Sequence, residues 1–370
     1  MRTTSFRRAL VPGVAALALA VSGCAAGNDT SSASGSEGGE SSLSGELAIG
    51  GASSQEAAQN AWIVGFQEAN PDVTVTYDPV GSGGGRESFI NGTYPTAGTD
   101  AYLTDDEGEL SAATERCGGT APIEIPNYVS PIAIVFNVDG VDELDLSPEA
   151  IAGIFAGEIT QWDDPAIAET NPDADLPSEP INPVHRGDES GTTENFTTYL
   201  DAVAPDVWDA GVVETWPTEY GGEAGQGTSG VISAVTNGTN AIGYADASQA
   251  GDLAVANVGV GDEFVGPTPE AAAAILSASP RVEGREPQSF VFELDYTTAE
   301  AGTYPIVLVS YMMACQSYDG DGQGELAKAY LEYVLSPEGQ EQGATEAGSA
   351  PLADDLEAEV TELVEGIQVG

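Results

Sequence analysis

The chain has 370 residues and is strongly acidic, with nine Lys and Arg against 60 Asp and Glu and a formal net charge of −51 at pH 7. This excess of negative charge argues against nucleic acid and anionic membrane surfaces as partners, because both would be repelled. The length is enough for two lobes rather than a single hydrophobic core.

The N-terminus has the pattern of an export signal. Three arginines precede the apolar run ALVPGVAALALAV, which is too short to span a bilayer. Val21-Ser22-Gly23-Cys24 follows and resembles the lipobox of bacterial lipoproteins, in which the cysteine is acylated, with palmitate as the expected acyl group. The alternative is an ordinary secretory signal with an incidental Cys24. We therefore expect a signal peptide over 1–24, a flexible Ser/Gly/Glu tether over 25–44, and a body held at the outer face of the cell membrane only by its lipid.

Strand and helix patterns alternate along the body. The expected strands are 45–51, 73–81, 130–140, 212–216, 241–246, 252–259 and 304–315. The expected helices are approximately 54–68, 84–91, 147–156, 192–203, 229–236, 269–277 and 324–336. This alternation predicts an α/β fold with mostly parallel sheets.

Three of these helices begin with glycine and hydroxyl residues, at 50–55, 81–85 and 188–193. A helix start exposes unpaired backbone N–H groups at the positive end of the helix dipole. Singly, each could be an ordinary helix cap. Together they predict an anion site, since ligands of α/β proteins bind beyond the carboxyl ends of the strands.

Four segments in order resemble the phosphate-binding lipoproteins of bacterial phosphate ABC transporters, the PstS family. They are GGASSQEAAQNAW (50–62), VGSGGGRESFINGTYPTAGTDAYL (80–103), IAGIFAGEITQWDDPAIAETNP (151–172) and HRGDESGTTENFTTYL (185–200). The fourth is the most specific. The resemblance extends from Gly45 to the C-terminus.

The resemblance implies a dehydrated phosphate gripped between two lobes. The matching ligand residues are Ser53, Ser54, Ser82, Asp100, Arg186, Asp188, Ser190, Gly191 and Thr192. Two positions depart from the family pattern. Glu189 stands where members more often have glycine, and Ser54 where many have an aromatic residue.

The chemistry of these residues suits a protonated oxyanion. Arg186 offers a planar fork of donors, and Asp188 either orients that fork or caps the following helix. Asp100 is favourable only if the ligand brings a proton to donate, as phosphate does and sulfate does not. The alternative is that Asp100 caps a helix beginning near Thr104.

Two further features carry other interpretations. His185 has no partner for a metal site and no nucleophile elbow nearby, so we expect it to pack beside the strand end that presents Arg186. The GQGTSG run at 225–230 formally matches a dinucleotide fingerprint, but the preceding EYGGEA does not read as a strand. We expect this turn to line the cleft instead.

The resemblance predicts a two-lobed, periplasmic-binding-protein-like α/β fold with a hinge. Lobe I would comprise 45–136 and 288–370 and lobe II 137–287, with crossings carried by 130–140 and 289–296. Cys117 and Cys315 form an even pair outside the cytoplasm, which predicts a disulfide, with two separate thiols as the alternative. The resemblance places both cysteines in lobe I.

The expected function is binding of inorganic phosphate and its delivery to an ABC permease, by a monomer without cofactor, metal or catalysis. Three alternatives remain. They are a receptor for sulfate or molybdate, a surface phosphatase using one of the serines, and an adhesin or sensor that shares only the fold.

Overall fold

The computed structural model describes residues 43–320 and 322–370. The predicted signal peptide, the lipid-acceptor Cys24 and nearly all of the tether lie outside this range. Within the described ranges, none of the helices combines the length and apolar character that a membrane span requires.

A nine-stranded mixed sheet runs through the molecule. Its order is β2-β1-β3-β12-β4-β8-β6-β7, and β9 also pairs with β4. The strands are β1 (Gly45–Gly51), β2 (Val73–Asp78), β3 (Thr96–Thr99), β4 (Ile123–Asn137), β6 (Asn182–Arg186), β7 (Glu223–Gly225), β8 (Ala241–Asp246), β9 (Ala254–Val255) and β12 (Val307–Ala314). The pairs toward both ends are parallel, as expected. The expectation of mostly parallel pairing is wrong at the centre, where β3, β12, β4 and β8 are antiparallel.

All seven expected helices are present among the longer helices. They are α1 (Glu56–Ala69), α2 (Ser82–Ile90), α4 (Pro148–Phe155), α6 (Gly191–Val203), α7 (Gly227–Asn237), α8 (Pro269–Ala278) and α9 (Gln323–Leu335). The structure adds α3 (Glu109–Arg116), α5 (Pro165–Ala168), α10 (Pro337–Ala347) and α11 (Asp354–Glu365), with 3-10 turns η1 (Ser53–Gln55), η2 (Thr218–Tyr220) and η3 (Ala247–Gln249). There are also two small sheets. One consists of β5 (Asp145–Leu146), β10 (Asn257–Val260) and β11 (Glu263–Val265), and the other of β13 (Ser317–Tyr318) and β14 (Gln368–Val369).

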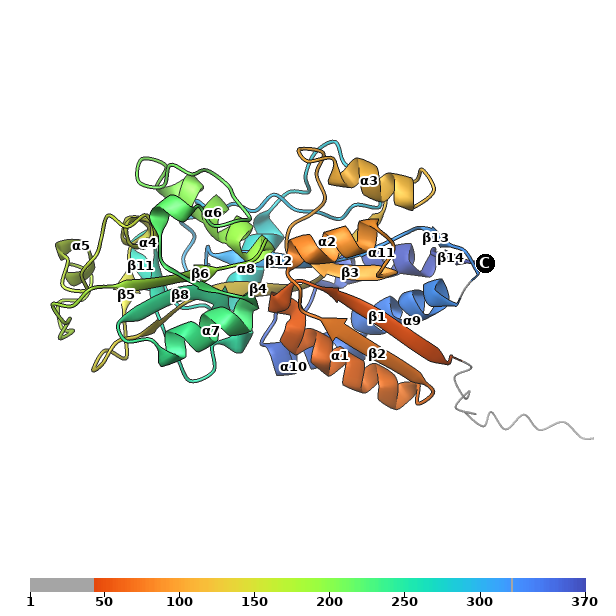
Figure 1. Ribbon diagram of the computed structural model, residues 1–370, viewed down its shortest axis with the longest axis horizontal. Helices are drawn as coiled ribbons and strands as arrows, with labels where there is room; N and C mark the ends of the chain where they lie inside the picture. Colours follow the sequence, from red (N-terminus) through yellow and green to blue (C-terminus); the bar gives the residue numbers. More distant parts are fainter. Residues whose placement is uncertain (1–42, 321) are drawn as a thin grey trace, which may run out of the picture. The chain divides into compact units, whose positions relative to one another are not determined.

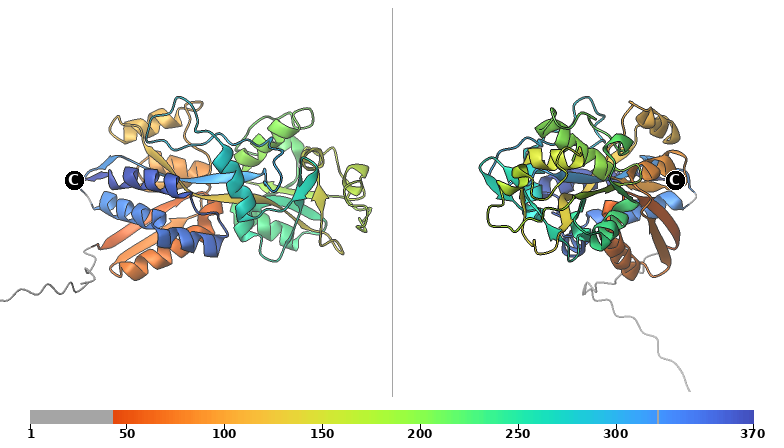
Figure 2. Two further views of the ribbon diagram at one scale, coloured as in Figure 1. Left: turned by 180° about the vertical axis from the view of Figure 1, so that it is seen from behind. Right: turned by 60° about the vertical axis from the view of Figure 1, so that its left-hand side comes forward.

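Two lobes lie along this sheet. In Figure 1, α4, α6 and α7 gather around β6 and β8 at one end, and α1, α2, α9 and α11 around β1 to β3 at the other. The reverse view in Figure 2 shows the blue C-terminal helices beside the orange N-terminal elements. The N- and C-terminal parts of the body therefore build one lobe together.

The central strands β4 and β12 pass from one hydrophobic core to the other. On β4 the change falls between Tyr128 and Val129, and on β12 between Tyr311 and Met312. The register of β12 against β4 shifts beside this point, between Ser310 and Tyr311. Residues 289–296 also pass between the cores but form only isolated bridges, so β12 supplies the second crossing strand.

We propose that the lobes follow the predicted division, with 45–136 and 288–370 in lobe I and 137–287 in lobe II. Residues 129–136 of β4 and 304–311, which lead into and include the first half of β12, then form the hinge, because they pack in the core of lobe II while the same strands continue in the sheet of lobe I.

The structure joins Cys117 and Cys315 in a disulfide with a Cα–Cα distance of 5.3 Å. Cys117 directly follows α3, and Cys315 directly follows β12. The bond therefore ties the late crossing strand to an early helix of lobe I across 198 residues of sequence.

Two expected strands differ in the structure. Residues 212–216 form a loop rather than a strand, because Val213 exchanges both backbone hydrogen bonds with the hydroxyl of Thr197 on α6. The segment 252–259 is divided between β9 and β10, which pair with different sheets.

Asp246 lies at the end of β8 and is fully buried. Its carboxylate accepts from Ser248 N at 3.0 Å and thereby caps η3. From η3, the amide of Gln249 donates to the carbonyl oxygen of Ser53 at 2.8 Å. By capping η3, Asp246 of lobe II thus helps to hold the loop after β1 of lobe I in place.

Replacing Asp246 should reveal a pH-dependent cost of burying its carboxylate. Burial raises the pKa of Asp246 to about 7, against about 3.9 for an exposed Asp. Because the folded pKa is raised, its contribution to stability is present below the unfolded pKa and lost as pH rises through the folded pKa. Asp246→Asn should therefore stabilise the protein by ~2–3 kcal/mol more at about pH 8.5 than at about pH 5. Urea unfolding measures this difference, and a pH-independent effect would contradict the assignment.

Candidate functional site

The predicted ligand residues converge where the two lobes meet. Lobe I contributes the loop after β1, the start of α2 and the end of β3, and lobe II contributes the segment from β6 into α6. Eight of the nine residues are fully or almost fully buried: Ser53, Ser54, Ser82, Asp100, Arg186, Ser190, Gly191 and Thr192. The ninth, Asp188, has a side chain only 7% exposed.

The carboxylate of Asp100 lies at the centre of a group of hydroxyls. Its Oδ2 accepts from Ser54 Oγ at 2.6 Å and from Thr192 Oγ1 of the other lobe at 3.3 Å. Its Oδ1 accepts from Ser310 Oγ at 2.7 Å. A carboxylate has about four acceptor positions. One therefore remains for a further donor.

Asp100 is not a helix cap. The next helix, α3, begins only at Glu109, and Gly108 occupies its N-cap position. Burial raises the pKa of Asp100, while hydrogen bonds from Ser54 and Ser310 act in the opposite direction, as does Arg186. The hydroxyls thus favour the ionised, acceptor-only form against desolvation.

Arg186 is held by its neighbour Asp188 and is linked to Asp100 through the hydroxyl of Thr192. Its Nε donates to Asp188 Oδ1 at 2.8 Å, and its Nη2 pairs with Asp188 Oδ2. Its Nη1 donates to Thr192 Oγ1 at 3.2 Å. The cap of α6 is Ser190, which accepts from Thr193 N, so Asp188 acts as the orienting partner and not as the helix cap.

The turn at 225–230 reaches the same place and contributes a residue that the sequence analysis did not single out. Thr228 N donates to Ser53 Oγ at 3.0 Å, and the two hydroxyl oxygens are 3.1 Å apart. Gly227 N donates to Asp188 Oδ1 at 3.0 Å. The start of α7 therefore joins the starts of α2 and α6 around the site.

The expectation that no strand directly precedes this turn was wrong. A short strand, β7, does precede it. However, the first two N–H groups of α7 are already bonded to Asp188 and Ser53, so the turn contacts the cleft as expected.

His185 packs as predicted beside the strand end. Its ring stacks on Trp216 with centroids 5.0 Å apart, and its Nδ1 lies 2.8 Å from the carbonyl oxygen of Arg186. Burial lowers its pKa, which favours the neutral ring. No group of three or more His, Cys, Asp or Glu side chains in residues 43–320 and 322–370 is arranged to hold a metal ion.

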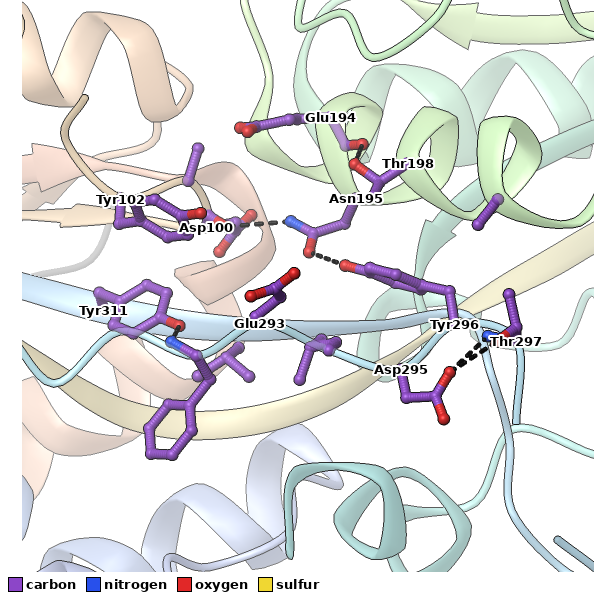
Figure 3. A pocket seen from close by; sticks show the side chains of 15 residues that line it. Asp100, Tyr102, Glu194, Asn195, Thr198, Glu293, Asp295, Tyr296, Thr297 and Tyr311 are labelled. Atoms are coloured by element: carbon purple, nitrogen blue, oxygen red, sulfur yellow. Dashed lines mark hydrogen bonds between the residues drawn. The ribbon is translucent and has the colours of Figure 1, made fainter. Parts of the chain in front are cut away.

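A side cavity of about 270 Å³ borders Asp100 and is lined by Tyr102, Asn195, Tyr296 and Tyr311 among others. Figure 3 shows Asn195 between Asp100 and Tyr296. Its amide nitrogen donates to the carbonyl oxygens of Asp100 at 2.9 Å and Gly191 at 2.7 Å, while its oxygen accepts from Tyr296 at 2.7 Å. Asn195 thus bonds the two lobes directly behind the site. The sequence signal for it is its position one helical turn after Gly191.

Comparisons with known proteins identify the family of the chain and its fold. A family model described as a PBP superfamily domain matches residues 32–338. The chain is 32% identical over 363 residues to the phosphate-binding protein PstS2 of Mycobacterium bovis, covering 96% of each chain, and is similarly related to PstS 2 of Mycobacterium tuberculosis. A solved high-affinity periplasmic phosphate-binding protein (PfluDING), bound with phosphate, shares the fold with a TM-score of 0.69 and 23% identity. That match covers 87% of this chain and 99% of the other.

Removing the charge of Asp188 should destabilise the protein strongly. Asp188→Asn leaves the 2%-exposed guanidinium of Arg186 without its counter-charge. Breaking a buried pair in this way costs about 3 kcal/mol or more. The matched control is Glu359→Gln, which breaks the exposed Arg281–Glu359 pair and should cost no more than about 1 kcal/mol. Denaturant unfolding compares the two, and equal losses would contradict the assigned role of Asp188.

Proposed function

This chain belongs to the PstS family of phosphate-binding proteins, and on that premise we propose that it binds inorganic phosphate outside the cytoplasm and delivers it to an ABC-type permease. One observation carries the choice of ligand. A buried carboxylate, Asp100, and a buried guanidinium, Arg186, lie on either side of the hydroxyl of Thr192, which is hydrogen-bonded to both. Such a site needs a ligand that is both an anion and a hydrogen-bond donor.

The proposed ligand set is the nine predicted residues with Thr228 added. The hydroxyls of Ser53, Ser82 and Thr228 lie beside the helix starts of α2 and α7. Arg186 supplies the single positive charge, and Asp188 fixes its orientation. Donors of this kind bind an oxyanion through short-range hydrogen bonds, which a repulsive long-range field does not prevent.

Asp100 provides the discrimination between oxyanions. Monohydrogen and dihydrogen phosphate both carry a P–OH group, which can donate to the remaining acceptor position of Asp100. Sulfate has no proton at neutral pH. Its oxygen would face the carboxylate oxygen of Asp100, and two hydrogen-bond acceptors would then lie together with no proton between them. The unpaired buried acceptor costs about 1–3 kcal/mol, and more when it is charged. Selection thus works mainly by penalising the wrong ligand.

Binding and release require no covalent step, so we propose a transport function and not an enzymatic one. Closure of the two lobes around β4 and β12 would bury the anion and create the surface that a permease recognises. We further propose a monomer anchored through lipid-modified Cys24 to the outer face of the membrane.

Calorimetry on residues 25–370, stripped of ligand by partial unfolding, tests the anion choice. The wild type should bind phosphate one-to-one and give no heat with sulfate. Asp100→Asn replaces one carboxylate oxygen by a donor, so it should weaken phosphate binding by ~10-fold or more and gain measurable sulfate binding. Asn195→Ala, behind the site, serves as the control that should keep the preference for phosphate.

Other outcomes would identify other functions. Equal heats with phosphate and sulfate, or none with either, would contradict phosphate selectivity. Turnover of a chromogenic phosphate ester by the wild type would favour a phosphatase.

The anion preference should depend on pH with a defined sign. Because burial raises the pKa of Asp100, this carboxyl takes up its proton at a higher pH than an exposed Asp does. Acidification should therefore weaken phosphate binding and strengthen sulfate binding, beginning above the ordinary titration range of Asp, about 3.9. Titrations at several pH values measure the ratio of the two dissociation constants. Asp100→Asn should lack this dependence, and an identical pH profile in the variant would contradict the role of Asp100.

A further inference from the structure

Arg86 is a second buried arginine at the junction of the lobes. Three of the nine Lys and Arg residues lie in the predicted signal segment, so the rest of the chain has only six. Arg86 lies on α2 of lobe I, and its side chain is 3% exposed. Its Nε contacts both carboxylate oxygens of Glu109 on α3 of the same lobe, at 3.0 and 2.8 Å. This pair positions the guanidinium within lobe I.

Two carboxylates of lobe II reach the same guanidinium from the other side. Arg86 Nη2 lies 2.5 Å from Glu214 Oε2 and 3.3 Å from Glu189 Oε1. Glu189 directly precedes the helix start that carries the anion site, and its carbonyl oxygen accepts from Gly83 N of lobe I at 3.4 Å. A Cβ at Gly83 would lie 2.4 Å from Glu189 Cδ, so any larger residue there would displace the Glu189 side chain from this position.

The loop that carries Glu214 is fixed to the same helix start. The carbonyl oxygen of Glu214 accepts from Ser190 N at 3.1 Å. Neighbouring Val213 is bonded to Thr197 of α6. Glu214 and Glu189 therefore move with the ligand-binding half of lobe II.

On lobe II these two carboxylates form a group of like charges with Glu194. Burial and then the nearby Glu214 raise the pKa of both Glu189 and Glu194. Burial acts to raise the pKa of Glu214 as well, but Arg86 lowers it overall. Arg86 forms ion pairs with Glu189 and Glu214, and its charge acts to lower the pKa of all three carboxyls. Separation of the lobes would therefore leave three carboxylates of lobe II facing one another without it.

We propose that Arg86 is an interlobe positioning residue, whose ion pairs with Glu189 and Glu214 hold the lobes closed over the bound anion and set the rate of its release. The inference rests on the proposed function. Arg86 is not hydrogen-bonded to Ser54, Thr192 or Ser310, which bind Asp100. Within lobe I its Nη1 donates to Thr99 Oγ1 at 3.3 Å, so it acts on the site as a positioning residue. Glu189 stands where the family more often has glycine. Its carboxylate forms an ion pair with Arg86.

The chain offers a matched pair of variants for the test. Glu214→Gln removes a contact that exists only between the lobes. Glu109→Gln removes a contact with the same arginine that persists whether the lobes are open or closed. Both substitutions remove one negative charge and keep Arg86 in place, so the buried cation is not deleted in either protein.

Stopped-flow measurement of phosphate release from the otherwise intact protein compares them. Glu214→Gln should raise the dissociation rate constant on the order of tenfold, with the association rate constant changed less than about threefold. Glu109→Gln should change dissociation less than about threefold. The ratio of phosphate to sulfate affinity should be unchanged in both, because the anion contacts are intact.

The possible failures are distinguishable. If the wild type does not bind phosphate, the proposed function is wrong and the closure role has no ligand to act on. If the wild type binds phosphate but Glu214→Gln releases it at the wild-type rate, the role of Arg86 is overturned and the function stands. Equal acceleration in Glu109→Gln and Glu214→Gln would also overturn it, since the effect would then not depend on closure.

Discussion

The proposed site depends on one electrostatic constraint, which is that a chain with a net charge of −51 would have to hold an anion. Long-range attraction is not available, so affinity must come from donors at hydrogen-bond distance. Arg186 supplies one positive charge, and Asp188 offsets it while fixing its direction. Asp100 then adds a negative charge that accepts from three hydroxyls and has one acceptor position left, which the proton of the proposed ligand would fill. A site of this kind accepts an anion because of its hydrogen-bonding pattern and not because of its charge.

The fold assembles this pattern by crossing two long strands between the lobes. The irregular register of β12 lies next to Ser310, whose hydroxyl bonds Asp100. The starts of α2, α6 and α7 meet at the same point from opposite lobes. The proposed donors are divided between the two lobes. The ligand would therefore be fully coordinated only when the lobes are together. Interlobe contacts away from the ligand, such as those of Arg86, would therefore affect binding by changing the population of the closed state.

Much of the fold and of the candidate site could be predicted from the sequence because their signals are local. The helix starts and Arg186 with Asp188 stand within short segments, and the expected helices were all present. Residues that enter from distant segments were missed: Ser310 in a buried strand, Thr228 in a glycine-rich turn and Glu214 in a segment expected to be a strand. The β-branched residues Val212 and Val213 favour a strand. In the structure, however, the backbone N–H and carbonyl of Val213 are bonded to the hydroxyl of Thr197 and not to another strand. The antiparallel centre of the sheet was also missed, because pairing direction depends on connections that no single segment encodes.

Neutron diffraction from a phosphate-bound crystal at about pH 8 would test the central claim most directly, because it locates protons. We expect the anion between Arg186 and Asp100, with a proton on the phosphate oxygen that faces an ionised Asp100. A proton on the carboxylate of Asp100 in place of the phosphate oxygen, or an anion bound away from both residues, would contradict it.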